Sequence, residues 1–114
     1  MAGKTHKTAS GDVQLPANNG VYYDGGWHAP VSERWTDVAA PGTGERLMAV
    51  ADAGAEDVAR AASAARNGAR AWRRTAPLAR AATLRKMAQR LRENARELAL
   101  LDALDCGNPV SEMG

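Results

Sequence analysis

The feature that most limits the fold of this 114-residue chain is a helical repeat of apolar residues in its second half. After Gly54, apolar residues recur three and four positions apart, which is the spacing of one face of an α-helix. They are Val58, Ala61, Ala62, Ala65, Ala69 and Trp72. Glu56 and Asp57 occupy the first turn, where the helix dipole favours negative charge. We therefore predict a helix over residues 54–74.

A second helix is expected over residues 75–106. Thr75 can serve as its N-cap, and Pro77 suits its first positions. Its apolar seam again follows helical spacing, through Leu84, Ala88, Leu91, Ala95 and Leu98. Gly107 is suited to a left-handed C-cap, and Pro109 just beyond it cannot continue the helix.

The length and composition of the two helices indicate that this sequence is part of a larger folded protein. At 1.5 Å per residue, about 28 helical residues in this segment would be roughly 40 Å long, whereas a compact chain of this length is only about 35 Å across. The alanine stripe of the first helix buries little area, so the pair gains little hydrophobic stabilisation by itself. Residues 109–114 begin like a further helix and reach the end of the sequence without a stop signal. We expect a larger structure to cover the helices and the polypeptide to continue.

The first half of the sequence predicts a flexible tail followed by short strands. Residues 1–20 are polar and lack a periodic apolar pattern, so they cannot offset their own ordering entropy. Residues 21–28, VYYDGGWH, place β-favouring residues on both sides of Asp24-Gly25-Gly26, which is a tight hairpin signal. Further strands are expected at residues 34–39 and 47–51, so that the early strands lie within residues 21–52.

Gly42 and Gly44 form a candidate phosphate-binding loop, but their spacing argues against that interpretation. A dinucleotide loop needs three glycines between a strand and a helix. Here the third position falls on Leu47, and the glycines precede the apolar run instead of following it. No Gly-Lys-Ser/Thr follows, which excludes a Walker loop. We interpret the two glycines as turn residues.

Positive charge is concentrated between Arg60 and Arg92, where ten arginine or lysine residues occur without an acidic residue. They form either the solvated faces of the two helices or a nucleic-acid surface. The only aromatic residue of this run, Trp72, gives bases little to stack on.

The N-terminus lacks the apolar core of a secretory signal, and no apolar run approaches the roughly 18 residues of a membrane span. Together with a single cysteine, this predicts a cytoplasmic protein.

Several stretches, taken in order, resemble the amino-terminal part of the NAD(P)-dependent aldehyde dehydrogenases. They are YYDGGWHAP at 22–30, PGTGE at 41–45, AGAEDVARAASAAR at 53–66, AWRRTAP at 71–77 and LRENARELALLDALDCGNP at 91–109. Ala40 and Gly42 depart from the asparagine and alanine that are usual in the family's turn, and Ala69 and Arg70 stand where phenylalanine and proline are common. The resemblance implies an α/β fold, with residues 21–114 as a partial amino-terminal cofactor-binding domain.

The resemblance also implies an enzyme that oxidises an aldehyde to a carboxylic acid. In this family a cysteine thiolate forms a thiohemiacetal, which passes hydride to NAD(P)+, and water then releases the acid. The family's motifs for the nucleophile, the base and the cofactor cradle do not occur in these 114 residues. We therefore assign no catalytic, cofactor-binding or metal-binding residue here, and we expect neither activity nor NAD(P) binding from this segment alone.

Four other residues have side chains that could take part in chemistry. Cys106 precedes a helix-ending glycine, and neither His6 nor His28 lies in a motif that would place a base beside it, so a structural thiol is expected. Asp105 matches an acidic position that, in some family members, helps hold a monovalent cation together with strand carbonyls, here around Val38 and Ala39. The alternative for Asp105 is a carboxylate hydrogen-bonded near a helix terminus.

The sequence leaves several alternatives open. The segment is the start of an NAD- or NADP-dependent enzyme, a remnant, or a non-catalytic binding module, either as one subunit of a split enzyme or as a basic helical nucleic-acid binder. The family resemblance implies a small aldehyde substrate and a homo-oligomeric parent. From the residues themselves we expect neither nucleic acid nor membrane as a partner. The identity of the aldehyde is not encoded in these residues.

Overall fold

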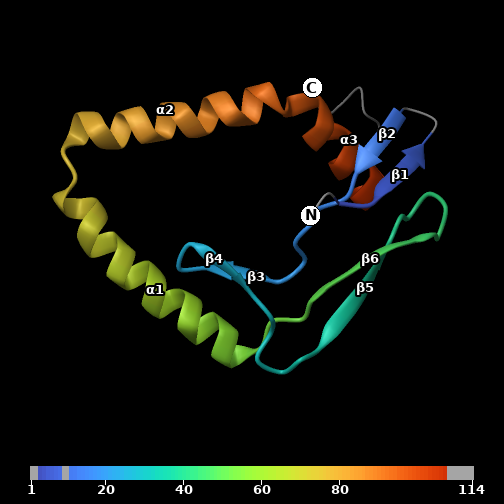
Figure 1. Ribbon diagram of the computed structural model, residues 1–114, viewed down its shortest axis with the longest axis horizontal. Coiled ribbons are helices and arrows are strands. Elements are labelled where there is room, and N and C mark those ends of the chain that lie inside the picture. The colour runs from blue at the N-terminus through green and yellow to red at the C-terminus, as the bar shows by residue number, and fades with distance from the viewer. Residues whose placement is uncertain (1–2, 9–10, 108–114) are drawn as a thin grey trace. The chain divides into compact units, whose positions relative to one another are not determined.

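The computed structural model describes residues 3–8 and 11–107, which divide into two units. The first unit contains the described residues of Met1–Asn19, Trp35–Val50 and Asn94–Gly114. The second contains Gly20–Arg34 and Ala51–Glu93. Figure 1 labels the strands and helices of both units in chain order. The further helix expected over residues 109–114 lies outside the described residues.

The first unit opens with an antiparallel strand pair, β1 (Thr5–Thr8) and β2 (Gly11–Gln14). The Leu15 N–H extends the pair by donating to the Lys4 carbonyl oxygen at 2.9 Å. Helix α3 (Ala95–Cys106) packs against β2. Val13 and Leu15 are both buried.

This strand pair differs from the flexible tail that the sequence predicts over residues 1–20. Among the described residues of this segment, two apolar side chains are buried, and two residues are too few to form a recognisable periodic pattern. They are nevertheless buried, because α3 and the residues of two later strands pack over them. The order of this segment therefore depends on contacts with residues distant in the sequence.

A second hairpin of this unit pairs β5 (Trp35–Ala39) with β6 (Arg46–Ala51), close to the expected strands. At the turn, the Ala40 carbonyl oxygen accepts hydrogen bonds from the N–H groups of Thr43 and Gly44, at 3.3 and 2.7 Å. Gly44 has a φ of 72°, a conformation that favours glycine. The interpretation of Gly42 and Gly44 as turn residues is confirmed.

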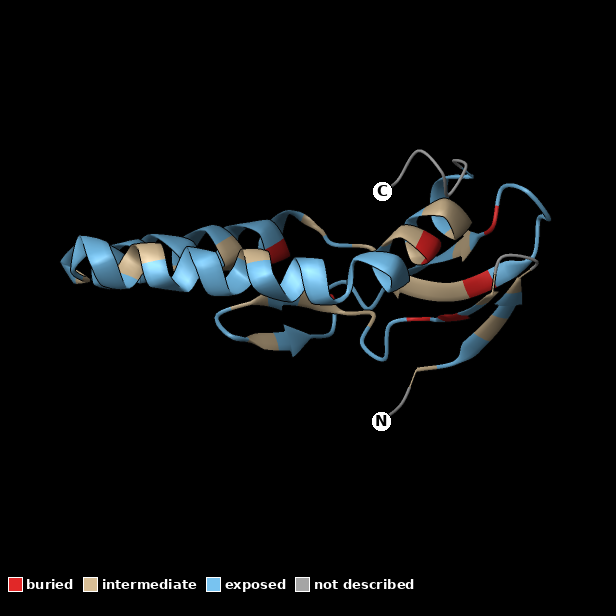
Figure 2. Cartoon of the chain, turned by 90° about the horizontal axis from the view of Figure 1, so that it is seen from above, coloured by how far each residue is buried: buried red, intermediate tan, exposed pale blue. Residues whose placement is uncertain are grey.

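The core of the first unit is a small apolar cluster. Leu15, Ala40 and Leu47 are its buried members. Buried residues are coloured red in Figure 2. Half-buried side chains from β5, β6 and α3 pack around them, namely Val38, Met48, Leu101 and Leu104. This cluster joins the two hairpins of the unit to its helix.

The second unit begins with the predicted hairpin, β3 (Val21–Tyr23) and β4 (Gly26–His28). The two turn residues, Asp24 and Gly25, have φ angles of 51° and 74°. Positive φ at both positions matches the twist of the flanking strands, which is why Asp-Gly is favoured in such turns. The Tyr22 and Trp27 rings lie opposite each other across the strands, with centroids 5.1 Å apart in an edge-to-face arrangement.

Helix α1 (Ala55–Arg74) follows and packs against β3, and it agrees with the helix predicted over residues 54–74. The role of Thr75 differs from the predicted N-cap of the next helix. Thr75 is the C-cap of α1: its N–H donates to the Trp72 carbonyl oxygen and its hydroxyl to that of Ala71. The next helix instead begins at Pro77, where a missing N–H costs nothing.

The prediction of one helix over residues 75–106 is wrong. The segment forms α2 (Pro77–Glu93) and α3, separated at Asn94, whose φ of −112° and ψ of 14° are not helical. Asparagine favours such interruptions because its side chain competes for backbone hydrogen bonds. The interruption also lies at the boundary between the two units. At its end, α3 has the predicted cap, with Gly107 at a φ of 76° and its N–H bonded to the Ala103 carbonyl oxygen.

Burial is unequal among the three helices. Leu100 on α3 is buried, whereas α2 contains no buried residue (Figure 2). On α1 the fully buried residue is the polar Asp57, and Val58 and Trp72 of the predicted apolar stripe are exposed. None of the described helices combines the length and apolarity that a membrane span requires.

Candidate functional site

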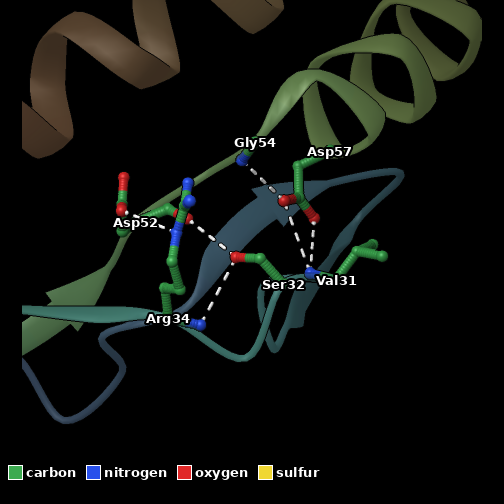
Figure 3. Close-up of polar contacts among 6 residues, drawn as sticks. All are labelled: Val31, Ser32, Arg34, Asp52, Gly54 and Asp57. Atoms are coloured by element: carbon green, nitrogen blue, oxygen red, sulfur yellow. Dashed lines mark hydrogen bonds and ion pairs between the residues drawn. The ribbon is translucent and has the colours of Figure 1, made fainter.

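The most developed polar arrangement of the described chain surrounds Asp57, in the first turn of α1 (Figure 3). Its side chain is inaccessible to solvent. One carboxylate oxygen, Oδ2, accepts a hydrogen bond from the Gly54 N–H at 2.9 Å. The other, Oδ1, accepts one from the Val31 N–H at 3.1 Å. The carboxylate therefore ties the start of α1 to the segment that leaves the β3–β4 hairpin.

These hydrogen bonds explain how a negative charge can be buried at this position. They lower the pKa of the Asp57 carboxyl below its ordinary value, with the bond from Gly54 contributing most. The bond from Val31 and the positive charge of Arg60 lower the pKa further, while burial opposes them. Hydrogen bonds to the charged form of a carboxyl favour that form, so Asp57 is an anion at neutral pH.

A second set of polar contacts joins the segment after the β3–β4 hairpin to Asp52, the residue that follows β6. The Ser32 hydroxyl donates to the Asp52 carbonyl oxygen at 3.4 Å, and the Arg34 N–H donates to the Ser32 hydroxyl oxygen at 3.3 Å. The Arg34 side chain completes the set with an ion pair to the Asp52 carboxylate at 3.1 Å. Figure 3 shows these contacts next to those of Asp57.

Arg60 connects α1 to the hairpin one turn further along. It forms an ion pair with Glu56 at 2.6 Å, and it interacts with Tyr23 of β3. These two partners raise the pKa of Arg60, with the Glu56 bond contributing most. Tyr23 in turn stacks on the His28 ring, with centroids 4.0 Å apart.

The Asp57 arrangement is suited to holding backbone segments together, and unsuited to catalysis or cofactor binding. Both carboxylate oxygens already accept backbone N–H groups, so Asp57 is not placed to take a proton from a substrate. A dinucleotide phosphate would need the free N–H groups and positive dipole of a helix N-terminus. At α1 that position is occupied by the Asp57 carboxylate, which would repel an anion. The N-terminus of α1 is therefore not suited to holding the phosphates of NAD(P).

The residues weighed from the sequence do not assemble into a catalytic site. Cys106 is exposed, and its thiol donates to the Asp102 carbonyl oxygen at 2.8 Å. His6 lies 3.8 Å from the Glu45 carboxylate, and His28 Nε2 lies 3.1 Å from the Tyr23 carbonyl oxygen. None of these contacts brings a histidine to Cys106.

Asp105 is the residue that the sequence suggests for a cation site. Asp105 is exposed in the last turn of α3. Within residues 3–8 and 11–107, no three side chains of His, Cys, Asp or Glu gather closely enough to hold a metal ion. The assignment of Asp105 to a cation site stays a prediction.

Sequence reasoning identified Asp57 only as a favourable charge at a helix start. One signal for its contact with Gly54 was present, because a residue at the third helical position can accept from the N-cap N–H. Its contact with Val31, 26 residues earlier, has no local signal. Ser32, Arg34 and Asp52 were missed for the same reason.

Comparisons with known proteins place these elements in a known context. Residues 27–114 match the model of the aldehyde dehydrogenase family. An aldehyde dehydrogenase of Talaromyces stipitatus is 36% identical over 99 residues, which cover 87% of this chain and 19% of that protein. The chain thus spans about a fifth of the length of this curated relative.

Solved structures agree with the sequence comparisons. Succinate-semialdehyde dehydrogenase from Burkholderia pseudomallei superposes with a TM-score of 0.82 at 33% identity, covering 89% of this chain and 21% of that one. Betaine aldehyde dehydrogenase from Staphylococcus aureus, solved in complex with NAD+, superposes with a TM-score of 0.80 at 28% identity, covering 84% and 20%. The hairpins and helices described above thus form an arrangement that recurs within much longer chains.

Proposed function

Since this chain belongs to the aldehyde dehydrogenase family, we propose that it is the amino-terminal part of an NAD(P)-dependent enzyme that oxidises an aldehyde to a carboxylic acid. In this proposal the cysteine nucleophile, the base and the cofactor-binding residues are supplied by other parts of the polypeptide. The 114 residues contribute early strands and helices to the cofactor-binding domain. NAD+ in the S. aureus neighbour supports NAD+ as the cofactor of the parent enzyme.

One observation carries the proposal: the matched relative and the superposed structures cover most of this chain, which in turn spans only about a fifth of their own length. The described residues are consistent with a supporting role. Their best-formed polar site holds two backbone N–H groups, and their cysteine has no described histidine partner.

A direct test compares the 114-residue chain with a longer polypeptide that contains it. Both are incubated with a panel of aliphatic and aromatic aldehydes and either NAD+ or NADP+, and reduced nicotinamide is measured by absorbance. We expect aldehyde-dependent reduction only from the longer polypeptide. Reduction by the 114-residue chain at a rate typical of enzymes, on the order of 1–1000 per second, would contradict the proposed division of roles. Absence of reduction by the folded longer polypeptide would contradict the proposed activity.

A nucleic-acid-binding module is the second candidate, and one feature of α1 favours it. Four arginines lie on one face of the last turns of α1, because their spacing of three and four residues follows the helical repeat. All four are exposed, and they are Arg66, Arg70, Arg73 and Arg74. Such a row of guanidinium groups can contact successive phosphates.

A salt titration distinguishes this candidate from a merely solvated helix face. Binding of a duplex DNA or RNA to the 114-residue chain is measured by fluorescence anisotropy at increasing salt. A phosphate-binding surface predicts affinity that falls steeply with salt, and a shallower slope after replacement of Arg66, Arg70 and Arg73 by glutamine. Replacement of Arg85, Lys86 and Arg92 on α2 by glutamine removes the same number of positive charges and is the control for position. A solvated face predicts no measurable binding at physiological salt.

A further inference from the structure

The chain contains two asparagine-glycine pairs, Asn19-Gly20 and Asn67-Gly68. Such a pair can lose its side-chain amide without an enzyme, because the backbone nitrogen of the glycine attacks the amide carbon of the asparagine. Glycine permits this attack most readily, since it has no Cβ and its backbone is the least restricted. The two pairs have the same side chains, so the backbone around each pair decides whether it reacts.

The pair Asn67-Gly68 lies inside α1 and is protected by the helix. In an α-helix the Gly68 N–H is hydrogen-bonded to the carbonyl oxygen four residues earlier, and the helical backbone angles direct the nitrogen away from the preceding side chain. The helix must open locally before the glycine nitrogen can reach the amide carbon. Asn67 is exposed, so its protection comes from the backbone and not from burial.

The pair Asn19-Gly20 has no such protection. It lies between β2 and β3, outside any helix or strand. Among the described residues, the Gly20 N–H donates no backbone hydrogen bond. The structure also requires a glycine here, because a Cβ added to Gly20 would clash with the His28 carbonyl oxygen. The residue that makes the pair reactive is therefore fixed by the fold of the hairpin that follows.

The side chain of Asn19 holds this segment to β6. It is half-buried, and its Nδ2 donates to the Ala49 carbonyl oxygen at 2.8 Å. A carboxylate in place of the amide has no hydrogen to donate, and its negative charge would repel the carbonyl oxygen. Loss of the amide would therefore break a contact between segments 30 residues apart.

We propose that Asn19-Gly20 is a site of spontaneous deamidation, and that the reaction releases the segment between β2 and β3 from β6. The Gly20 nitrogen gives up its proton to solvent and forms a bond to Cγ of Asn19. The bond between Cγ and Nδ2 breaks, the nitrogen takes up a proton and leaves as ammonia, and a succinimide ring remains. Water, the one co-reactant, then opens the ring at Cγ to give aspartate or at the backbone carbonyl carbon to give isoaspartate.

Both products carry a carboxylate where the amide was, so both lose the hydrogen bond to Ala49. Isoaspartate also lengthens the main chain by one carbon. The succinimide pathway needs no aldehyde, NAD(P) or catalytic residue, so this modification is independent of the proposed function.

The second asparagine-glycine pair provides an internal control for the experiment. A longer polypeptide that contains this chain, shown to be folded by circular dichroism, is incubated at mildly alkaline pH, and a second sample is incubated in concentrated urea. Peptide mapping by mass spectrometry follows both asparagines, and electron-based fragmentation separates isoaspartate from aspartate. In the folded sample we expect Asn19 to deamidate at least about tenfold faster than Asn67, because α1 must open before Asn67 reacts. In urea, where neither pair is held by structure, the two rates should become similar.

Substitutions test the consequence of the reaction. Asn19→Asp introduces the carboxylate directly, and Asn67→Asp adds the same charge at an exposed position of α1. Hydrogen exchange of the peptide that contains β6 is measured in both variants by mass spectrometry. We expect Asn19→Asp to accelerate this exchange by at least about threefold and Asn67→Asp to leave it unchanged. Asn19→Gln, whose longer side chain closes a ring far more slowly, should abolish the deamidated product at this position.

Three results would overturn the proposal. Asn67 that deamidates as fast as Asn19 in the folded sample would show that the backbone does not select the site. Asn19 that stays intact in the folded sample while both residues react in urea would show that the fold protects it. Equal exchange of β6 in the two aspartate variants would refute the release of the segment. Deamidation is scored by mass, so a polypeptide that lacks aldehyde oxidation would contradict the proposed function and leave this test valid.

Discussion

Asp57 shows how a single charged residue can be buried at low cost. Removing a carboxylate from water is unfavourable unless hydrogen bonds replace the lost solvent. Here backbone N–H groups on both sides supply them, one from the residue before the helix and one from the segment after the hairpin. The side chain thereby connects two stretches of backbone that are distant in sequence. Its role is to position α1 against the hairpin.

Replacing Asp57 with alanine should loosen this connection. Without the carboxylate, the Val31 and Gly54 N–H groups lose their acceptor, and we expect their hydrogen exchange to accelerate by roughly tenfold or more. Exchange measured by NMR on the 114-residue chain or the longer polypeptide tests this. Glu56→Ala is the control, because it removes an exposed acidic neighbour and its ion pair to Arg60 while keeping Asp57. Equal exchange rates in the two variants would contradict the assigned role.

The pH dependence of the same contact follows from the lowered pKa of Asp57. In the folded chain this pKa lies below the ordinary value of 3.8, so the carboxylate stabilises the folded state at every pH above that value. The contribution is lost as the pH falls through the lower, folded-state pKa. We expect the amide chemical shifts of Val31 and Gly54 to stay constant above about pH 5 and to titrate together with a midpoint below 3.8. A midpoint above 3.8 would show that burial outweighs the hydrogen bonds.

At the scale of elements, the β3–β4 hairpin depends on its two-residue turn. Gly25 has a φ of 74°, so Gly25→Ala forces a side chain into the left-handed region at a cost of about 1–2 kcal/mol. We expect weaker cross-strand NMR contacts between Tyr22 and Trp27. Gly42→Ala is the matched control, because Gly42 lacks a positive φ and an added Cβ there would meet open space. A hairpin that withstands both substitutions equally would contradict the turn assignment.

Elements were predictable from the sequence where a local signal specifies them. The Asp24-Gly25 turn, the turn at Gly42 and Gly44 and the Gly107 cap each rest on residues that favour one backbone conformation. Helix α1 was predictable from its periodicity and its acidic first turn.

The elements that were missed depend on contacts remote in the sequence. β1 and β2 are ordered by two apolar residues that pack under α3 and the β5–β6 hairpin. The separation of α2 from α3 at Asn94 was missed because the apolar repeat continues through it from Leu91 to Leu98. Likewise, the Asp57 contact with Val31 joins two loops that no sequence pattern relates.

At the scale of the whole molecule, burial is concentrated in one of the two units. Among the described residues the buried apolar side chains are Val13, Leu15, Ala40, Leu47 and Leu100, all in the first unit. The second unit buries Asp57 and Pro30, and its two helices leave several large apolar residues exposed, including Val58, Leu78 and Leu84. Two-stranded hairpins are marginally stable by themselves, and a core of this size supplies little hydrophobic stabilisation.

The central proposal is that these 114 residues need the rest of a longer dehydrogenase polypeptide to complete their hydrophobic packing. Thermal unfolding of the isolated chain, followed by far-ultraviolet circular dichroism on a sample shown to be monomeric by analytical ultracentrifugation, tests it most directly. We predict a gradual loss of helical signal over a broad temperature range, without a cooperative transition. A sharp two-state transition of the monomer, with no other chain present, would contradict the claim.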